Sequence, residues 1–139
     1  MRLFQCQACG QPLYFESTSC ESCGHRLGFL PHSQTLTAVE RDGEVWRALA
    51  DPDRPYRFCS NAEHDVCNWL VPARSAESFC VACRHNRTIP DLSQQGNVAR
   101  WRALETAKRR LFYTLLRLGL PLVTRAENPT GLAFDFLAD

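Results

Sequence analysis

The sequence predicts a small α+β protein whose fold depends on bound metal, and three observations support that prediction. The chain of 139 residues begins with two C-x-x-C-G units, holds four more cysteines in its middle, and then shows one long stretch of helical periodicity. Hydrophobic residues make up 45% of the chain and charged residues 22%, a composition typical of globular proteins. The formal net charge of +1 gives no argument for a nucleic-acid or membrane partner.

The cysteines are expected to bind metal rather than to form disulfides. The sequence has no apolar export segment after its first residues, and no run of about 18 apolar residues that could span a membrane. We therefore expect a cytoplasmic protein, and disulfides are rare in the reducing cytosol. Closely paired cysteines in such a chain are interpreted first as metal ligands.

Residues 1–30 are predicted to form a zinc ribbon. In CQACGQPLYFESTSCESCG, each C-x-x-C turn presents two thiolates to one ion, and two turns complete the tetrahedral site that zinc prefers. Gly10 and Gly24, which follow the two turns, can adopt backbone angles that residues with a Cβ resist. Residues 13–15 and 26–30 are strand candidates. The predicted zinc ligands are Cys6, Cys9, Cys20 and Cys23.

Two other interpretations of these four cysteines are weaker. Iron in a rubredoxin-like site uses the same tetrahedral thiolates, so iron is the alternative metal. A redox sensor would need exposed thiolates that carry no metal, and a thioredoxin-like pair would need a βαβ context that the sequence lacks.

Short strands are expected between the two cysteine sets. Two apolar stretches flank Asp42 and Gly43, a dipeptide that favours a hairpin turn. The DPDRP sequence at residues 51–55 is expected to be a turn-rich loop, because it contains two prolines.

A second cysteine-rich zinc module with short strands is predicted within residues 31–96. Its candidate ligands are Cys59, Cys67, Cys80 and Cys83. Only the last pair has C-x-x-C spacing, so His64 or His85 is an alternative to one thiolate, although a solvated loop position is the favoured interpretation of both histidines. Burial of Cys59 and Cys67 as small hydrophobic residues is the other alternative. Neither module has many apolar side chains, so both zinc ions are expected to be structural and to stabilise the fold.

Residues 97–139 are predicted to form one long amphipathic helix and a terminal strand. Asn97 is the expected N-cap of a helix that runs from Val98 to about Leu118, and Gly119 ends it. We expect this helix to pack through its apolar stripe, which is wide enough to need a partner beyond the two metal modules. The stripe consists of Trp101, Leu104, Ala107, Leu111, Phe112, Leu115, Leu116 and Leu118.

The basic residues on one side of the helix are expected to face solvent, whereas Glu105 and Lys108 fall within the apolar arc. Glu105 is predicted to pair with Arg109 at i,i+4. The basic side of the helix consists of Arg102, Arg109, Arg110 and Arg117. An ordinary solvated face is the favoured interpretation, and a surface for nucleic acid or an acidic partner is the alternative.

The terminal strand is predicted from the alternation of Leu132, Phe134 and Phe136 with small or polar residues. Chain ends are usually polar and loose unless they are docked. A strand this apolar therefore pairs within the domain or belongs to a longer protein, and we expect that residues 97–139 begin a truncated downstream domain.

The whole chain resembles the N-terminal part of bacterial zinc-binding metallopeptidases, in which the first segment is a zinc ribbon. The matching segments are LFQCQACGQPLYFESTSCESCGHRLGFLP, YRFCSNAEHDVCNWLVPA, FCVACRHNRTIPDLS, AKRRLFYTLLRLGLPL and GLAFDFLAD, which cover most of the chain. The resemblance implies a cytoplasmic protein, the eight cysteines as zinc ligands, and a downstream peptidase-like domain that carries H-E-x-x-H. This chain has no H-E-x-x-H motif, so no catalytic residue carries over.

The predicted function is that of a zinc-binding structural or interaction module, the non-catalytic N-terminal part of a larger metallopeptidase. Its expected partner is the downstream peptidase-like domain or another protein. The alternative is a nucleic-acid-binding zinc ribbon that uses the helix arginines with Arg84 and Arg87, and its binding would weaken steeply with salt. The near-neutral charge, and the lack of aromatic residues interleaved with basic ones, weigh against that alternative.

Overall fold

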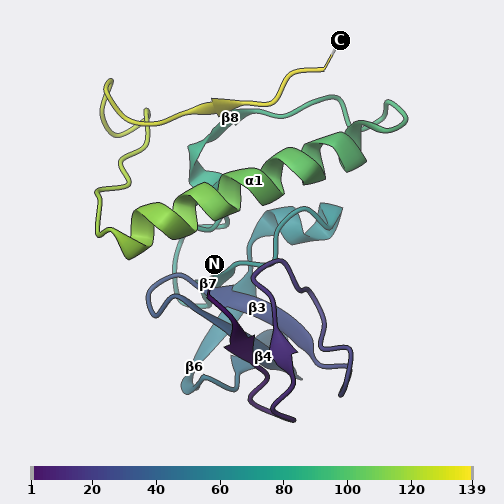
Figure 1. Ribbon diagram of the computed structural model, residues 1–139. Coiled ribbons are helices and arrows are strands. Elements are labelled where there is room, and N and C mark those ends of the chain that lie inside the picture. Colours follow the sequence, from purple (N-terminus) through teal and green to yellow (C-terminus); the bar gives the residue numbers. More distant parts are fainter. Residues whose placement is uncertain (1, 139) are drawn as a thin grey trace.

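A long helix lies between two layers of strands in the computed structural model, which describes residues 2–138 (Figure 1). The arrangement confirms the predicted α+β fold with two cysteine clusters, short strands, one long helix and a terminal strand. The elements in chain order are β1 (Phe4–Gln5), β2 (Pro12–Leu13), β3 (Arg26–Leu30), β4 (Thr35–Asp42), β5 (Val45–Ala48), β6 (Asp51–Phe58), the 3-10 helix η1 (Ser60–His64), β7 (Leu70–Pro72), the 3-10 helix η2 (Cys83–His85), β8 (Asn86–Thr88), α1 (Asn97–Arg117) and β9 (Phe134–Asp135). Within the described residues, no helix combines the length and the apolar character needed to cross a membrane.

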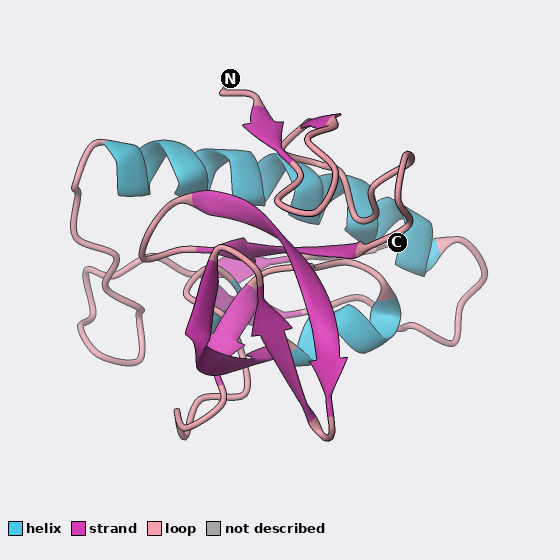
Figure 2. Cartoon of the chain, turned by 90° about the horizontal axis from the view of Figure 1, so that it is seen from below, coloured by secondary structure: helices cyan, strands magenta, loops and turns pink. Residues whose placement is uncertain are grey.

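Strands β3 to β7 form one antiparallel sheet in which each strand pairs with the next along the chain (Figure 2). Pairing of Asp42 with Val45 closes the predicted hairpin between β4 and β5. The sheet curls until its last strand returns to its first, where the backbone N–H of Phe29 donates to the carbonyl of Asn68 at 2.9 Å. The rings of Phe29 and Trp69 lie 4.7 Å apart at this closure and form the centre of the core.

The prediction of a loop over residues 51–55 is wrong, because β6 begins at Asp51 and runs through both prolines. Proline cannot donate to a sheet ladder, so a strand with neighbours on both sides accepts it only where the pairing is irregular. The register shifts between Arg47 and Ala48, with Pro55 opposite Arg47 and Asp51 opposite Ala48. Pro52 lies in this bulge and has no partner in β5, whereas Pro55 stays opposite Arg47 at the edge of the bulge.

The C-terminal segment packs against the rest of the protein through β9. Strand β9 pairs in parallel with β8, and the backbone N–H of Phe136 then donates to the carbonyl of Thr88 at 2.8 Å. Side chains also connect the two strands, since the guanidinium of Arg87 donates to both carboxylate oxygens of Asp135. Phe136 is buried, whereas Leu132, which the alternation places on the same face, is 41% exposed.

Helix α1 buries a different face from the predicted one. Gly96, rather than Asn97, is its N-cap. Trp101 and Phe112 are buried as predicted, but Leu104 and Leu111 are 51% and 44% exposed. The residues that are buried along α1 are Asn97, Trp101, Glu105, Lys108, Arg109, Phe112 and Tyr113.

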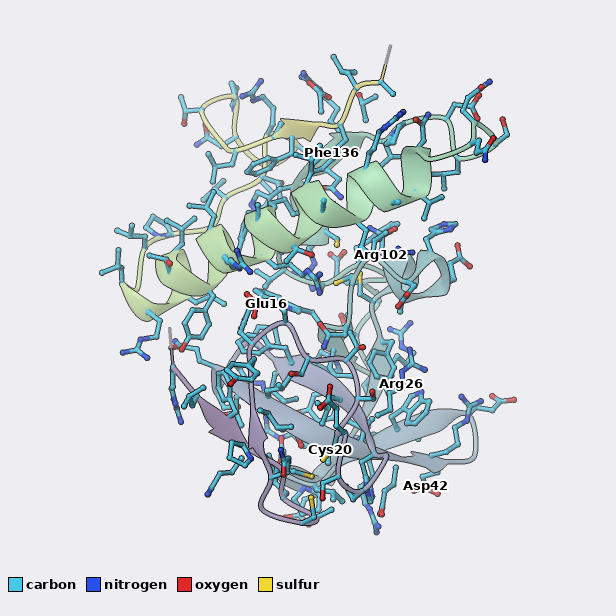
Figure 3. All side chains as sticks on the ribbon, turned by 45° about the vertical axis from the view of Figure 1, so that its right-hand side comes forward. Glu16, Cys20, Arg26, Asp42, Arg102 and Phe136 are labelled. Atoms are coloured by element: carbon cyan, nitrogen blue, oxygen red, sulfur yellow. The ribbon has the colours of Figure 1, made fainter. Side chains whose placement is uncertain are left out.

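The buried face of α1 contacts both strand layers. On the ribbon side, the ring of Tyr113 lies 5.0 Å from Phe15 and 5.9 Å from Phe29. On the other side, the ring of Phe112 lies 5.8 Å from Phe134 of β9. Figure 3 shows this sandwich, with Glu16 below α1 and Phe136 above it.

Charged side chains on the buried face of α1 neutralise one another. Glu105 is fully buried, Lys108 is 4% exposed, and Lys108 Nζ lies 2.9 Å from Glu105 Oε2. The predicted Glu105–Arg109 ion pair is wrong, and so is the solvent-facing position of Arg109. The Arg109 guanidinium donates instead to Asn68 Oδ1 at 2.9 Å, which ties the helix to the sheet.

The corrected helix orientation makes a testable prediction. Leu111→Ala is expected to change the free energy of unfolding by less than about 1 kcal/mol, because the side chain is largely exposed. Phe112→Ala is the matched comparison and is expected to cost several times more, because its ring is fully buried. Urea unfolding of both variants measures the difference, and equal losses would show that Leu111 packs in the core.

Candidate metal centres

The first four cysteines lie on two backbone turns of the same shape. In each turn the glycine N–H donates to the carbonyl of the first cysteine at 2.8 Å, from Gly10 to Cys6 and from Gly24 to Cys20. Both glycines have a φ of +80°, a left-handed conformation that a side chain would strain. Strands β1 and β2 hold the first turn, and β3 begins directly after the second. The two turns therefore present their thiol groups toward one point.

The sulfur separations in this group fit a tetrahedral zinc ion. Cys6 Sγ lies 3.6 Å from Cys23 Sγ, and Cys9 Sγ lies 3.6 Å from Cys20 Sγ. Four sulfurs at Zn–S bonds of about 2.3 Å would be about 3.8 Å apart. A disulfide needs about 2.05 Å, so these cysteines are not paired covalently. The backbone N–H of Cys23 also lowers the pKa of Cys20 to about 6, which favours the thiolate that a metal requires.

A chain of polar groups that the sequence did not predict leads from the first centre to the sheet. His25 Nδ1 lies 3.2 Å from Cys23 Sγ, and His25 Nε2 lies 3.0 Å from Glu40 Oε2. Arg47 donates to the other carboxylate oxygen of Glu40 at 2.5 Å. The hydrogen bond to His25 lowers the pKa of Glu40. A carboxylate behind a histidine fixes the orientation of its ring. A ring that carries protons on both nitrogens donates to the Glu40 carboxylate and to the Cys23 thiolate at once.

We expect His25→Asn to weaken zinc binding at the first centre by about 10- to 100-fold, the usual loss when a group that orients a ligand is removed. Competition with a chromophoric chelator measures that affinity. His32→Asn is the control, since the His32 ring stacks on Tyr56 and lies in the turn after β3. Equal zinc affinity in the two variants would show that the contact between His25 and Cys23 has no influence on the metal.

The second four cysteines are brought together from four separate positions around the core. Cys59 precedes η1, Cys67 follows it, Cys80 precedes η2, and Cys83 begins η2. All four are buried, and their sulfur atoms lie within 4.8 Å of one another. Cys67 Sγ lies 3.8 Å from Cys80 Sγ, which again matches a tetrahedral ion.

Backbone N–H groups point at the sulfurs of the second centre. The N–H of Cys80 donates to Cys59 Sγ at 3.3 Å, and the N–H of Cys83 donates to Cys80 Sγ at 3.4 Å. Burial raises the pKa of Cys80, and hydrogen bonding to Cys59 raises the pKa of Cys67. Four buried thiols cannot all ionise at one point without a cation. The donor set thus fits a divalent metal that prefers sulfur, as zinc does.

The two histidines considered as alternative ligands lie outside both cysteine groups. His64 Nε2 is 3.2 Å from Glu63 Oε1, and its ring lies 5.9 Å from that of Trp101. His85 is 2% exposed and packs 4.8 Å from the Phe112 ring. Burial lowers the pKa of His85, so the neutral ring is favoured. In residues 2–138, each group with metal-binding geometry contains cysteines alone.

The two centres differ in exposure, and we expect them to lose metal at different rates. Cys9 and Cys23 of the first centre are exposed, whereas every cysteine of the second is buried. A chelator should remove one zinc equivalent quickly and the other slowly. Stopped-flow release with a zinc-binding dye measures both phases, and Cys9→Ser should abolish the fast phase alone. Release of two equivalents in a single phase would contradict this prediction.

The two cysteine centres and the small curled sheet define a protein of the zinc-ribbon class. Residues 3–94 match a zinc-ribbon domain family, and residues 97–139 match a family described as "Putative zinc-binding metallo-peptidase". The chain belongs to the zinc-ribbon family and is a zinc-binding module related to those metallopeptidases, with two four-cysteine groups for two structural zinc ions.

Relatives in mycobacteria share the whole region. Uncharacterised proteins of Mycobacterium tuberculosis (strains H37Rv and CDC 1551) and of Mycobacterium bovis are each 36% identical to the chain over 139 residues. The match covers 99% of this chain but 38% of each relative, so the chain spans less than two fifths of their length. No solved structure matches the chain.

Proposed function

We propose that the chain is a zinc-dependent structural module, without hydrolytic activity of its own, that supports a peptidase-like domain through residues 97–139. The eight cysteines at the two centres hold the two zinc ions. The division at residue 96 then separates the zinc-binding part from the part related to metallopeptidases. Because zinc needs reduced cysteines, the proposed location is a reducing compartment such as the cytoplasm.

The observation that carries this proposal is that each centre offers four thiolates. Four thiolates close a tetrahedral zinc site, whereas a catalytic zinc keeps one position open for water or substrate. In the first centre two sulfur pairs lie 3.6 Å apart, in the second one pair lies 3.8 Å apart, and the four sulfurs of each group all lie within 4.8 Å of one another, as a closed site requires. The four histidines, at positions 25, 32, 64 and 85, do not have the spacing of H-E-x-x-H. The zinc sites therefore supply folding energy rather than a reactive water.

The nucleic-acid alternative has little support from the helix, since few of its arginines are free to bind phosphate. Arg109 is buried on Asn68. Arg102 pairs with Asp65, and Arg110 pairs with Glu16 on the ribbon. A nucleic-acid surface needs several unpaired basic side chains on one face. We therefore propose a protein-supporting module in preference to a nucleic-acid-binding one.

The proposal is tested by measuring metal content and hydrolysis on the same sample. Elemental analysis of protein purified without added metal should give two zinc equivalents per chain. A broad peptide library should remain uncut by the zinc-loaded chain. Zinc-dependent cleavage that is lost when one of the four histidines is replaced would overturn the assignment of a non-catalytic module.

A further inference from the structure

The outer side of α1 carries an apolar stripe that no segment among residues 2–138 covers. Its members follow one another at alternating intervals of three and four residues, and we call them the α1 seam: Leu104, Ala107, Leu111, Thr114 and Leu118. All five are exposed, and the three leucines are 51%, 44% and 66% exposed. Alternation of three and four is the repeat by which one helix presents a continuous edge to another helix.

The seam is not a set of scattered surface leucines. It extends over about 21 Å of helix, at about 1.5 Å per residue. The opposite side of α1 is already filled, since Trp101 and Phe112 pack into the protein. A helix that is apolar on two sides belongs in the interior of a larger assembly.

A hollow continues the seam at its N-terminal end. This hollow has a volume of about 510 Å³, and Leu104 of the seam forms part of its wall. Trp101 and Phe136 line it from the helix and from the C-terminal segment, and Arg100 stands at its side. The hollow adjoins the apolar seam at Leu104 and has polar groups from Asn97 and Arg100 in its wall, so it offers a place for a protruding side chain with a polar end.

The charges beside the seam indicate the chemistry of its partner. Arg100 and Arg117 flank its two ends, and neither forms an ion pair with a carboxylate in the part of the chain that the structure describes. Their guanidinium groups contact only neutral oxygens, of Asn97 and of the Tyr113 hydroxyl. In a second copy of the chain, packed parallel or antiparallel on this seam, arginine would face arginine. The charge therefore favours a helix with acidic flanks over self-association.

We propose that the α1 seam docks a helix of the peptidase-like domain, and that this helix carries an apolar edge flanked by acidic side chains. This inference rests on the proposed function. The seam lies within residues 97–139, which match the metallopeptidase family. In the mycobacterial relatives, more than half of the polypeptide lies outside the matched region, which is enough additional chain to cover the seam.

Radical footprinting with mass spectrometry tests the proposal, because it reports the solvent access of individual side chains. The comparison is between the 139-residue chain and the full-length M. tuberculosis relative in which this chain replaces the matched region. The three seam leucines should be labelled at least several-fold less in the chimera, while Tyr14 on the ribbon, 67% exposed, should be labelled equally in both. Equal labelling of the leucines would overturn the inference. Protection in the isolated chain that grows with concentration would also overturn it, in favour of a second copy.

If the chimera does not fold, peptide binding to the 139-residue chain tests the inference instead. Synthetic helical peptides of 21 residues, the length of α1, carry leucines at the same spacing and differ only in glutamate or lysine flanks. The glutamate peptide should bind the 139-residue chain at least tenfold more tightly than the lysine peptide. Leu111→Lys should abolish this binding, and Tyr14→Lys should leave it unchanged. No preference for glutamate, or no effect of Leu111→Lys, would overturn the inference. Zinc content, measured on the same samples, tests the proposed function separately.

Discussion

Cys80→Ser is expected to leave the chain with one zinc ion and to destabilise the fold more than any single change at the first centre. Cys80 is buried, and its sulfur accepts the backbone N–H of Cys83 and lies 3.8 Å from Cys67 Sγ. The binding energy of a structural zinc is folding energy, on the order of 10 kcal/mol in small zinc modules. We expect the free energy of unfolding to fall by at least ~4 kcal/mol, which is exceptional for one substitution.

The reason for the difference between the two centres is their place in the core. All four cysteines of the second centre belong to the buried cluster of Trp69 and Phe112, whereas only Cys6 and Cys20 of the first centre do. Cys20 of the first centre lies at the end of the ribbon remote from α1 (Figure 3). Elemental analysis and urea unfolding of Cys80→Ser, Cys9→Ser and the exposed control Ser78→Ala measure the effect. Two zinc equivalents in Cys80→Ser, or the same stability as Cys9→Ser, would contradict the prediction.

The features that the sequence predicts well are those fixed by short stretches of chain. Each C-x-x-C-G turn is completed within a few residues, and the sulfur positions follow from the turn itself. The Asp42-Gly43 hairpin and the strand over Arg26–Leu30 are equally local. The second cysteine group is harder to predict from the sequence, because Cys59 and Cys67 reach it from opposite ends of η1.

The features that the sequence predicts poorly depend on distant partners. Strand β6 accommodates Pro52 in a register shift that lies opposite Arg47 and Ala48 of β5. Hydrophobic periodicity misplaced the buried face of α1, since it counts Leu104 and Leu111 as buried and treats Glu105 and Lys108 as intrusions on the apolar arc. The signal that could have corrected it is the i,i+3 spacing of Glu105 and Lys108, which allows the two charges to neutralise each other between Trp101 and Phe112.

The second large effect on stability is expected from the buried ion pair of Glu105 and Lys108. Lys108 connects three elements: its Nζ lies 2.9 Å from Glu105 Oε2 in α1, 2.5 Å from Asn86 Oδ1 in β8, and 5.7 Å from the Phe134 ring centroid in β9. Glu105 Oε2 has this ion pair but no hydrogen bond of its own. Removal of the ammonium would therefore leave a carboxylate that is fully buried and short of a partner.

Lys108→Met is accordingly expected to lower the free energy of unfolding by about 3–5 kcal/mol, the usual loss when one member of a buried ion pair is removed. The double variant Lys108→Met with Glu105→Gln should recover most of that loss, because Asn86 and Trp101 can still donate to the neutral amide oxygen at the position of Oε1. Arg102→Met is the surface control and should cost less than about 1 kcal/mol, since its ion pair with Asp65 is exposed.

Urea unfolding of the four variants, including Glu105→Gln alone, gives the coupling energy. If Lys108→Met and Arg102→Met were equally mild, or the double variant were no better than Lys108→Met, the ion pair would not be what holds α1 between β8, β9 and the ribbon.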